Sequence, residues 1–138
     1  MEKKPGRLIS VIHRKVYQIM AQKLKNCDID VGQFFFLRYL VANPGISQEE
    51  VAKNNYLDKA TVSKGVKRLE ELGYIKRIVN PKDKRSYFLQ PTEKAVAYKS
   101  KLEEYHKEIN KFIFDGLSEN EYRQLGEILQ KIVNNIEN

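Results

Sequence analysis

The sequence predicts a mainly α-helical domain with one small β-hairpin, and three observations lead to this fold class. Apolar residues recur every three or four positions along most of the chain, which is the period of one helix face. Capping signals with Ser, Thr or Asp precede several of these segments. The stretch RIVNPKDKRSYFLQ, residues 77–90, departs from the helical period, because two runs rich in β-branched and aromatic residues flank an Asn-Pro turn signal.

The composition fits one domain, residues 1–138. A chain of 138 residues with 41% hydrophobic residues can bury a core of its own. Its longest apolar run is far shorter than the roughly 20 residues that a membrane span needs, and its first ten residues lack the apolar core of a signal peptide. We therefore expect a soluble, cytoplasmic protein.

Residues that would support metal binding or catalysis are scarce. The single cysteine, Cys27, excludes an internal disulfide framework, and the isolated His13 and His106 offer little for metal ligation. The chain shows no Gly-rich phosphate loop and no linear Ser, His and Asp arrangement. We expect no metal, no cofactor and no enzymatic activity, although a site assembled in space from distant residues stays open.

Positive charge is concentrated in the middle of the chain. Nine Lys or Arg residues stand against three acidic residues between Lys59 and Arg85, whereas residues 91–138 contain more acids than bases. This asymmetry predicts an anionic partner for the middle of the chain. A Lys-rich solvated surface is the alternative.

The first two predicted helices differ in character. Between Leu8 and Leu24 the apolar residues follow one helix face, which predicts an amphipathic helix. Asp30 and Gln33 then form a capping-box signal, and residues 31–42 are apolar nearly all round. We expect a short buried helix there, although the run FFFLRYL is also compatible with a strand.

The centre of the chain predicts two helices and a hairpin. Ser47 and Glu50 form a second capping-box signal, Asp58 can cap the next helix, and Gly73 is placed to end it in the left-handed conformation. A short helix, a tight turn, a helix over about residues 59–72 and then a hairpin is the order of a winged helix-turn-helix.

Two further helices end the chain, one capped by Thr92 and one by the Ser118 and Glu121 capping box. Each carries a narrow apolar seam; these seams are Ala95, Tyr98, Leu102, Tyr105, Ile109 and Phe112 in one helix, and Tyr122, Leu125, Leu129, Ile132 and Ile136 in the other. Such seams need a partner to bury them. A second copy of the chain would serve, and so would another part of the same chain.

The helix over residues 59–72 has one apolar face and one polar face. Val62, Val66 and Leu69 point to one side and are expected to pack, while Gly65 suits a place where another helix backbone comes near. Small residues, hydroxyls and cations on the other side can approach bases and phosphates. These candidate contacts are Lys59, Ala60, Thr61, Ser63, Lys64, Lys67 and Arg68. An ordinary amphipathic helix with a Lys-rich solvent face is the alternative.

The tip of the hairpin, residues 80–85, carries three cations and one acid. Lys82, Lys84 and Arg85 place positive charge on a thin protrusion that can enter a minor groove. Asp83 lies two residues before Arg85, where its carboxylate can accept hydrogen bonds from the guanidinium or cap the turn. We expect this acid to hold the arginine in one orientation before binding, although an accidental turn Asp stays possible.

The run from Ser47 to Thr92 resembles the multiple antibiotic resistance regulator (MarR) family. The residues that carry the resemblance are Leu69, Glu70, Gly73, Tyr74, Ile75, Arg77, Asp83, Arg85, Leu89 and Thr92. The helices on both sides fit in order and length, so the resemblance covers essentially the whole chain. One departure is the ending LQPT, where a shorter Leu-x-Leu-Thr is common in the family.

The resemblance implies a dimeric, sequence-specific transcriptional regulator of double-stranded DNA, typically a repressor. Residues 1–30 and 91–138 would form the dimerisation helices, and about residues 31–90 the DNA-binding lobe. The recognition helix, about 59–72, would enter the major groove of a pseudo-palindromic operator, and the wing, about 80–85, the minor groove. Ser47 and Gln48 would join the residues above as DNA contacts. An architectural DNA binder or a protein-interaction module without an effector is the alternative.

Many members of the family bind small aromatic acids, which implies an effector site here too. Candidate lining residues are His13, Arg14, Tyr17, Phe36 and Tyr39, with Arg14 meeting a carboxylate. Core aromatics and solvent-facing cations are the alternative for all five. A redox role for Cys27 is disfavoured, because the adjacent Asp28 should raise rather than lower the pKa of the thiol.

Overall fold

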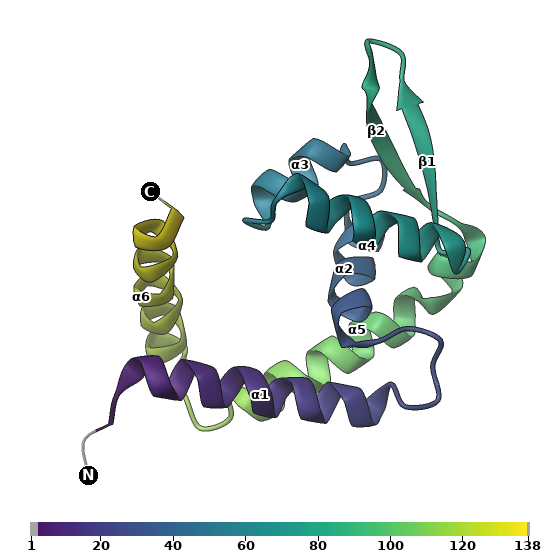
Figure 1. Cartoon of the computed structure of the whole chain (residues 1–138). Helices are drawn as coiled ribbons and strands as arrows, with labels where there is room; N and C mark the ends of the chain where they lie inside the picture. Colours follow the sequence, from purple (N-terminus) through teal and green to yellow (C-terminus); the bar gives the residue numbers. More distant parts are fainter. Residues whose placement is uncertain (1–2, 138) are drawn as a thin grey trace.

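The computed structural model describes residues 3–137 (Figure 1). The elements follow in the order α1 (Pro5–Lys23), α2 (Val31–Ala42), α3 (Gln48–Asn54), α4 (Lys59–Glu71), β1 (Ile75–Asn80), β2 (Asp83–Pro91), α5 (Glu93–Ile113) and α6 (Glu119–Glu137). The predicted fold class, mainly helical with one hairpin, is therefore confirmed. Across residues 3–137, no helix combines the length and the hydropathy of a membrane span.

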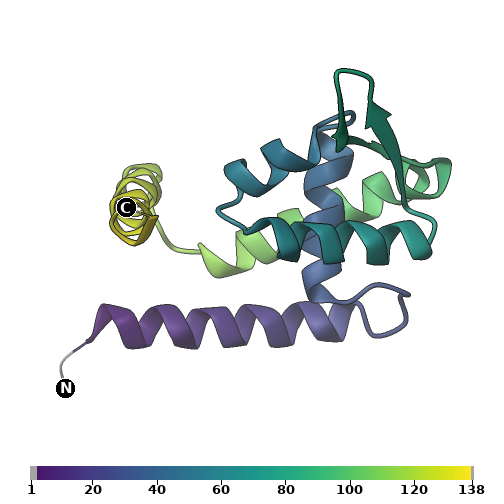
Figure 2. The same ribbon diagram turned by 45° about the horizontal axis from the view of Figure 1, so that its top comes forward.

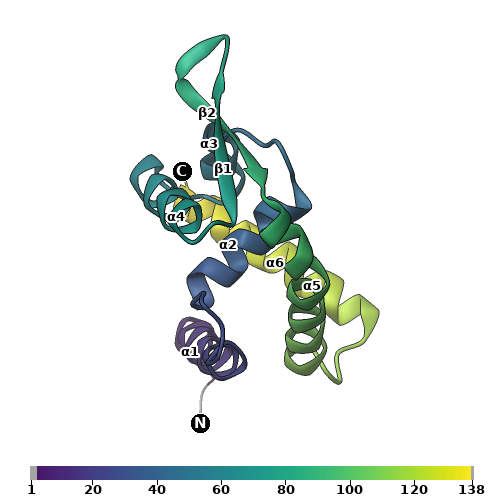
Figure 3. The ribbon, with the colours of Figure 1, turned by 90° about the vertical axis from the view of Figure 1, so that its right-hand side faces the viewer.

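The helices form a lobe that stands on a base. Figures 1 and 2 show α3, α4 and the hairpin grouped around α2, with α1 beneath this group, and Figure 1 shows α5 running beneath it as well. α2 connects the two layers, because it packs against α1 and α5 below and against α4 and β2 above. α6 leaves the base as a separate arm, and Figure 3 shows the hairpin projecting from the opposite end of the lobe to the base.

The predicted helix starts are confirmed by their hydrogen bonds. Asp30 and Gln33 make both bonds of a capping box at α2, and this start excludes the strand alternative for FFFLRYL. Asp58 Oδ1 accepts from the N–H of Thr61 at α4, 2.6 Å. α3 is simpler than predicted: Ser47 Oγ accepts from the N–H of Glu50, 3.0 Å, but the Glu50 side chain points into solvent, where water competes for it.

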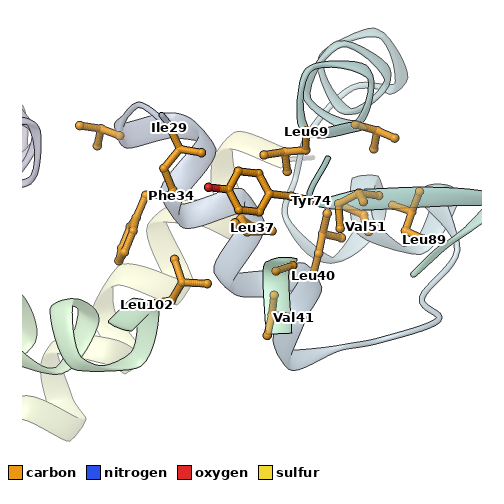
Figure 4. Packing of buried hydrophobic residues seen from close by; sticks show 14 of the residues in the cluster. Ile29, Phe34, Leu37, Leu40, Val41, Val51, Leu69, Tyr74, Leu89 and Leu102 are labelled. Atoms are coloured by element: carbon orange, nitrogen blue, oxygen red, sulfur yellow. The ribbon is translucent and has the colours of Figure 1, made fainter. Parts of the chain in front are cut away.

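The core lies where α2 meets the elements around it. Figure 4 shows Phe34, Leu37 and Leu40 of α2 in one cluster with Leu69 of α4 and Tyr74 at the start of the hairpin. All five side chains are fully buried. Each contributes about 1.5–3 kcal/mol by leaving water, so the lobe is held mainly by contacts with α2.

The hairpin is antiparallel and is held on one edge by the chain before α3. Its register runs from Ile75 opposite Pro91 to Val79 opposite Tyr87, with an irregularity before the turn. The N–H of Leu89 donates to the Ile46 carbonyl, 2.9 Å, which ties β2 to the lobe. The wing therefore projects from a fixed base.

The two apolar seams of the C-terminal helices have different fates. Ala95, Leu102 and Ile109 of α5 are buried within the chain, so an intrachain partner serves most of that seam. Phe112 at its end is 70% exposed. No residue of α6 is buried, and Ile136 is 75% exposed.

Candidate nucleic-acid interface

Helix α4 presents the predicted polar face to solvent. Val62, Val66 and Leu69 are buried against the lobe, as expected. Every predicted contact of this helix is exposed; these are Lys59, Ala60, Thr61, Ser63, Lys64, Lys67 and Arg68. The helix therefore offers a continuous surface of cations, hydroxyls and one small residue.

The N-terminus of α4 is held by Asp58. The N–H of Thr61 donates to its carboxylate, and this bond is the main reason why the pKa of Asp58 lies below its ordinary value. An ionised cap complements the positive end of the helix dipole. The first turn of α4, which carries Ala60 and Thr61, is thereby fixed.

The two predicted contacts on α3 are placed differently. Ser47 is half-buried and its hydroxyl already caps α3, while its backbone bridges to Phe88 of the hairpin. Gln48 is half-buried and its buried Oε1 has no hydrogen-bond partner among the described residues. The Ser47 hydroxyl is therefore already used as a helix cap, whereas the Gln48 side-chain oxygen could still accept a hydrogen bond.

The wing tip shows the expected pairing of acid and base. The backbone N–H of Arg85 donates to Asp83 Oδ1 at 3.0 Å, and Nε of Arg85 lies 3.5 Å from the same oxygen. The Arg85 side chain is 94% exposed. Asp83 thus holds both the backbone and the guanidinium of a residue that otherwise reaches into solvent. Lys82 and Lys84 are also exposed beside it.

A groove of about 590 Å³ separates α4 from the wing. It brings together residues from α3, α4 and both strands; they are Gln48, Glu49, Lys59, Val62, Ser63, Arg77, Asp83, Arg85, Ser86 and Tyr87. Five of the thirteen predicted contacts line this groove, namely Gln48, Lys59, Ser63, Asp83 and Arg85. Lys64, Lys67 and Arg68 continue this surface along α4 but do not line the groove.

Arg77 and Tyr87 line the groove, and neither was among the predicted contacts. The guanidinium of Arg77 donates to both carboxylate oxygens of Glu70, 3.0 and 3.2 Å, and lies 4.9 Å from the centre of the Tyr87 ring. The bond to Glu70 is the main reason why the pKa of Arg77 is raised. The hairpin register offered a signal, because residue 77 lies diagonally across from residue 87.

The group closest to Gly65 is not the helix backbone that was predicted. A Cβ at this position would lie 2.9 Å from Cε1 of Phe36, so the close approach is made by an aromatic ring and not by a helix backbone. The glycine leaves room for the Phe36 ring of α2 beside α4. Phe36 is thereby engaged in packing.

The five predicted effector residues are distributed over α1 and α2. His13, Arg14 and Tyr17 are exposed along α1, and the hydroxyl of Tyr39 accepts a hydrogen bond from Asn54, 3.2 Å. Neither of the two hollows described for residues 3–137 is lined by any of the five.

The larger of those hollows, about 830 Å³, lies beside α5 and α6 and includes His106, Phe114 and Tyr122. Partial burial, and then the nearby Arg38, lower the pKa of His106.

Cys27 is half-buried and packs against the core. Its redox role stays an untested alternative.

Known proteins share this arrangement. Residues 28–86 match the model of the MarR family. The HTH-type transcriptional regulator BilQ of Clostridium symbiosum is 31% identical over 110 residues, which cover 80% of this chain and 76% of that protein. The HTH-type transcriptional regulator YybA of Bacillus subtilis is 28% identical over 131 residues, covering 95% of this chain and 87% of that protein.

Solved structures agree over nearly the whole length. A MarR-family regulator from Listeria monocytogenes complexed with 26mer DNA superposes with a TM-score of 0.87 at 30% identity, covering 99% of this chain and 91% of that one. The S. aureus MepR–DNA complex gives a TM-score of 0.88 at 27% identity, covering 98% and 99%. The chain therefore belongs to the MarR family and is a DNA-binding transcriptional regulator rather than an enzyme.

Proposed function

We propose that this regulator is a cytoplasmic homodimer that binds a pseudo-palindromic operator in double-stranded DNA and represses transcription. In this proposal, residues 59–72 enter the major groove and residues 80–85 enter the minor groove. The DNA backbone that separates the major groove from the minor groove then lies along the protein groove between α4 and the wing. Residues 1–30 and 91–138 serve as dimerisation helices.

The observation that carries the proposal is the position of α4 and Arg85 on two sides of one groove. Lys59 and Ser63 border it from the helix, and Arg85 borders it from the wing. A helix fits the major groove of B-DNA, and an extended arginine fits the narrow minor groove. A surface that served only solubility would not need these groups to converge.

The unburied face of α6 supports a homodimer. Its Tyr122, Leu129 and Ile136 are all exposed, although they repeat every seven residues along one apolar seam. A second copy of the chain would bury them, and two-fold symmetry would then present two winged lobes to an inverted repeat. Two of the related structures contain DNA, which supports the same partner for this chain.

Selection from random duplexes tests the proposal. We expect an inverted repeat whose half-sites lie about one helical turn apart. Affinity should fall with salt, each neutralised phosphate contributing a log-log slope of about −0.9. Lys64→Ala/Lys67→Ala should weaken binding, and its matched control, Lys99→Ala/Lys101→Ala on α5, should not. Binding without sequence enrichment would favour an architectural role.

Repression and release form the second part of the proposal. With the selected operator placed across a promoter, added protein should reduce the transcript in a purified transcription system. Benzoate, as a small aromatic acid, should restore it if α1 and α2 hold an anionic effector near Arg14. A ligand releases DNA only through its preference for the state that does not bind DNA. Arg14→Ala should keep repression in the presence of benzoate. No release of the wild type by benzoate, or equal release of the wild type and Arg14→Ala, would remove this effector site from the proposal.

A further inference from the structure

A polar cluster lies at the junction of the lobe and the base, away from the DNA-binding groove. We call Asp28, Tyr74 and Lys94 the junction cluster. The hydroxyl of Tyr74 donates to one carboxylate oxygen of Asp28, and Nζ of Lys94 donates to the other at 2.9 Å. The ammonium of Lys94 also lies 4.2 Å from the centre of the Tyr74 ring. Three segments distant in the sequence therefore meet here.

Main-chain hydrogen bonds reinforce the same junction. Lys94 Nζ donates to the carbonyl of Leu72, 2.7 Å, at the C-terminal end of α4. The hydroxyl of Thr92 donates to the carbonyl of Gly73, 2.6 Å, and the N–H of Thr92 donates to the carbonyl of Tyr74, 3.0 Å. The end of α4 is thus tied directly to the start of α5.

The chemistry of the cluster favours one arrangement. Tyr74 is 0% exposed, so its hydroxyl would lose a hydrogen bond without Asp28. Burial raises the pKa of Tyr74, which keeps the phenol neutral as a donor, and the bond from Tyr74 lowers the pKa of Asp28, which keeps the acceptor ionised. A charge-assisted bond of this kind is stronger and more directional than a neutral one.

The contacts between the lobe and α5 include one group along the middle of the helix and another at its start. Along the middle of α5, α2 packs on it through the rings of Phe34 and Tyr105, whose centres are 6.4 Å apart, and through Arg38 and Glu103 at 3.2 Å. At the start of α5 the junction cluster makes the second attachment. The second attachment lies at a different point along α5 and therefore adds a restraint on the orientation of the lobe about α2.

We infer that the junction cluster is a positioning device that fixes the orientation of α4 relative to α5. The inference rests on the proposed dimeric function, because in a dimer this orientation sets the separation of the two recognition helices. Asp28, Tyr74 and Lys94 are positioning residues and do not touch DNA. Their role is to select operators by the spacing of the half-sites.

A spacing series tests this role. The selected operator is prepared with zero, one or two base pairs added or removed between its half-sites, and a single half-site serves as a separate probe. Wild-type protein should prefer the selected spacing by about tenfold, while Tyr74→Phe and Asp28→Asn should reduce that preference to about threefold. Affinity for the single half-site and the salt slope should stay unchanged. Asp115→Asn, in the exposed turn before α6, is the matched control.

A distance measurement provides the second readout. Spin labels at Glu71→Cys in a Cys27→Ser background report the separation of the two α4 helices in the free dimer. Adding Asp28→Asn or Lys94→Gln should broaden the distribution of this distance. If Tyr74→Phe does not fold, these two exposed positions decide the question, because neither change opens a cavity in the core.

Each outcome has a consequence. A spacing profile and a distance distribution equal to those of the wild type would overturn the inference, and so would a uniform loss that includes the single half-site, since this indicates a general loss of structure. A wild-type protein without any spacing preference would remove the proposed dimeric function and the inference together. That last result is visible before any variant is made, so the two failures are distinguishable.

Discussion

The lobe and the C-terminal arm use apolar residues in opposite ways. In the lobe, α2 is surrounded, and Phe34, Leu37 and Leu40 are fully buried. In the arm, α6 is amphipathic along its whole length, yet no residue from Glu119 to Glu137 is buried. Both α2 and α6 have the apolar pattern of a helix that packs against a partner, but only the apolar side chains of α2 are buried within one chain.

This difference separates what a single chain can stabilise from what an assembly must supply. Burial of α2 contributes to folding at any protein concentration. An exposed seam such as that of α6 contributes only when a second surface covers it, so its stabilisation depends on concentration. Changes in the lobe and in the arm should therefore differ in kind as well as in size.

The largest expected effect is a cavity in the lobe. Leu37→Ala should lower the free energy of unfolding by about 3 kcal/mol, because a fully buried leucine loses its contacts and leaves a void. Urea unfolding at two protein concentrations measures it. Ile78→Ala, at a half-exposed position of the hairpin, should stay within about 0.5 kcal/mol of the wild type. A Leu37→Ala loss as small as that of the control would contradict the assignment of α2 as the centre of the core.

The next largest effect comes from changing the exposed apolar seam of α6. Leu129→Glu/Ile136→Glu places two charges on the exposed seam and should convert a dimer to a monomer in light scattering. Affinity for a two-half-site operator should fall about 100-fold, since the second half-site is no longer bound by the same particle. Asn135→Glu adds a charge to the same helix off the seam and should leave the mass unchanged. A double variant that stays dimeric would show that the seam of α6 is not the interface.

A smaller effect concerns Arg85, a lobe residue whose side chain is almost fully exposed. Arg85→Ala should weaken DNA binding about tenfold and reduce the salt slope by about 1, with no change in the unfolding curve. Asp83→Asn should weaken binding by about threefold and leave the slope almost unchanged, because it loosens the arginine without removing its charge. Mobility shifts at several salt concentrations distinguish the two. Equal affinity for Arg85→Ala and wild type would reject the wing contact.

The smallest effect lies at the junction cluster, where the lobe meets the start of α5. The hydrogen bond from Tyr74 holds the pKa of Asp28 below its ordinary value of 3.8, so the ionised form is favoured by folding. The stabilisation is therefore present above pH 3.8 and is lost as the pH falls through the lower folded-state pKa. The stability difference between wild type and Asp28→Asn should shrink over that range in acid titrations of unfolding. A difference that grows with acid would reverse the sign and contradict the ion pair.

The sequence predicted most of the fold because most of its signals are local. The caps at Asp30, Asp58 and Thr92 are formed as expected, and Gly73 adopts a φ of +84°. The exposed face of α4 also follows from helical periodicity. The prediction that a helix backbone lies near Gly65 was wrong. A glycine within a helix indicates that another group comes close, but not which group does.

The candidate interface was predicted in part for the same reason. Asp83 and Arg85 are two residues apart, so their contact depends on one turn. Arg77 and Tyr87 were missed as lining residues, because their contact requires the hairpin register and the bond to Glu70 on α4. No periodicity in a single element contains that information.

By itself, the sequence determined which segments become helices, where they start, where the hairpin turns and where positive charge is concentrated, since each depends on neighbours within a few positions. Only the tertiary structure decided that Tyr74 meets Asp28 across 46 residues and that Lys94 joins them across 66. Such contacts depend on how whole elements are oriented, and that orientation is set by packing around α2. The same packing leaves every residue of α6 from Glu119 to Glu137 unburied, which no pattern within α6 could reveal.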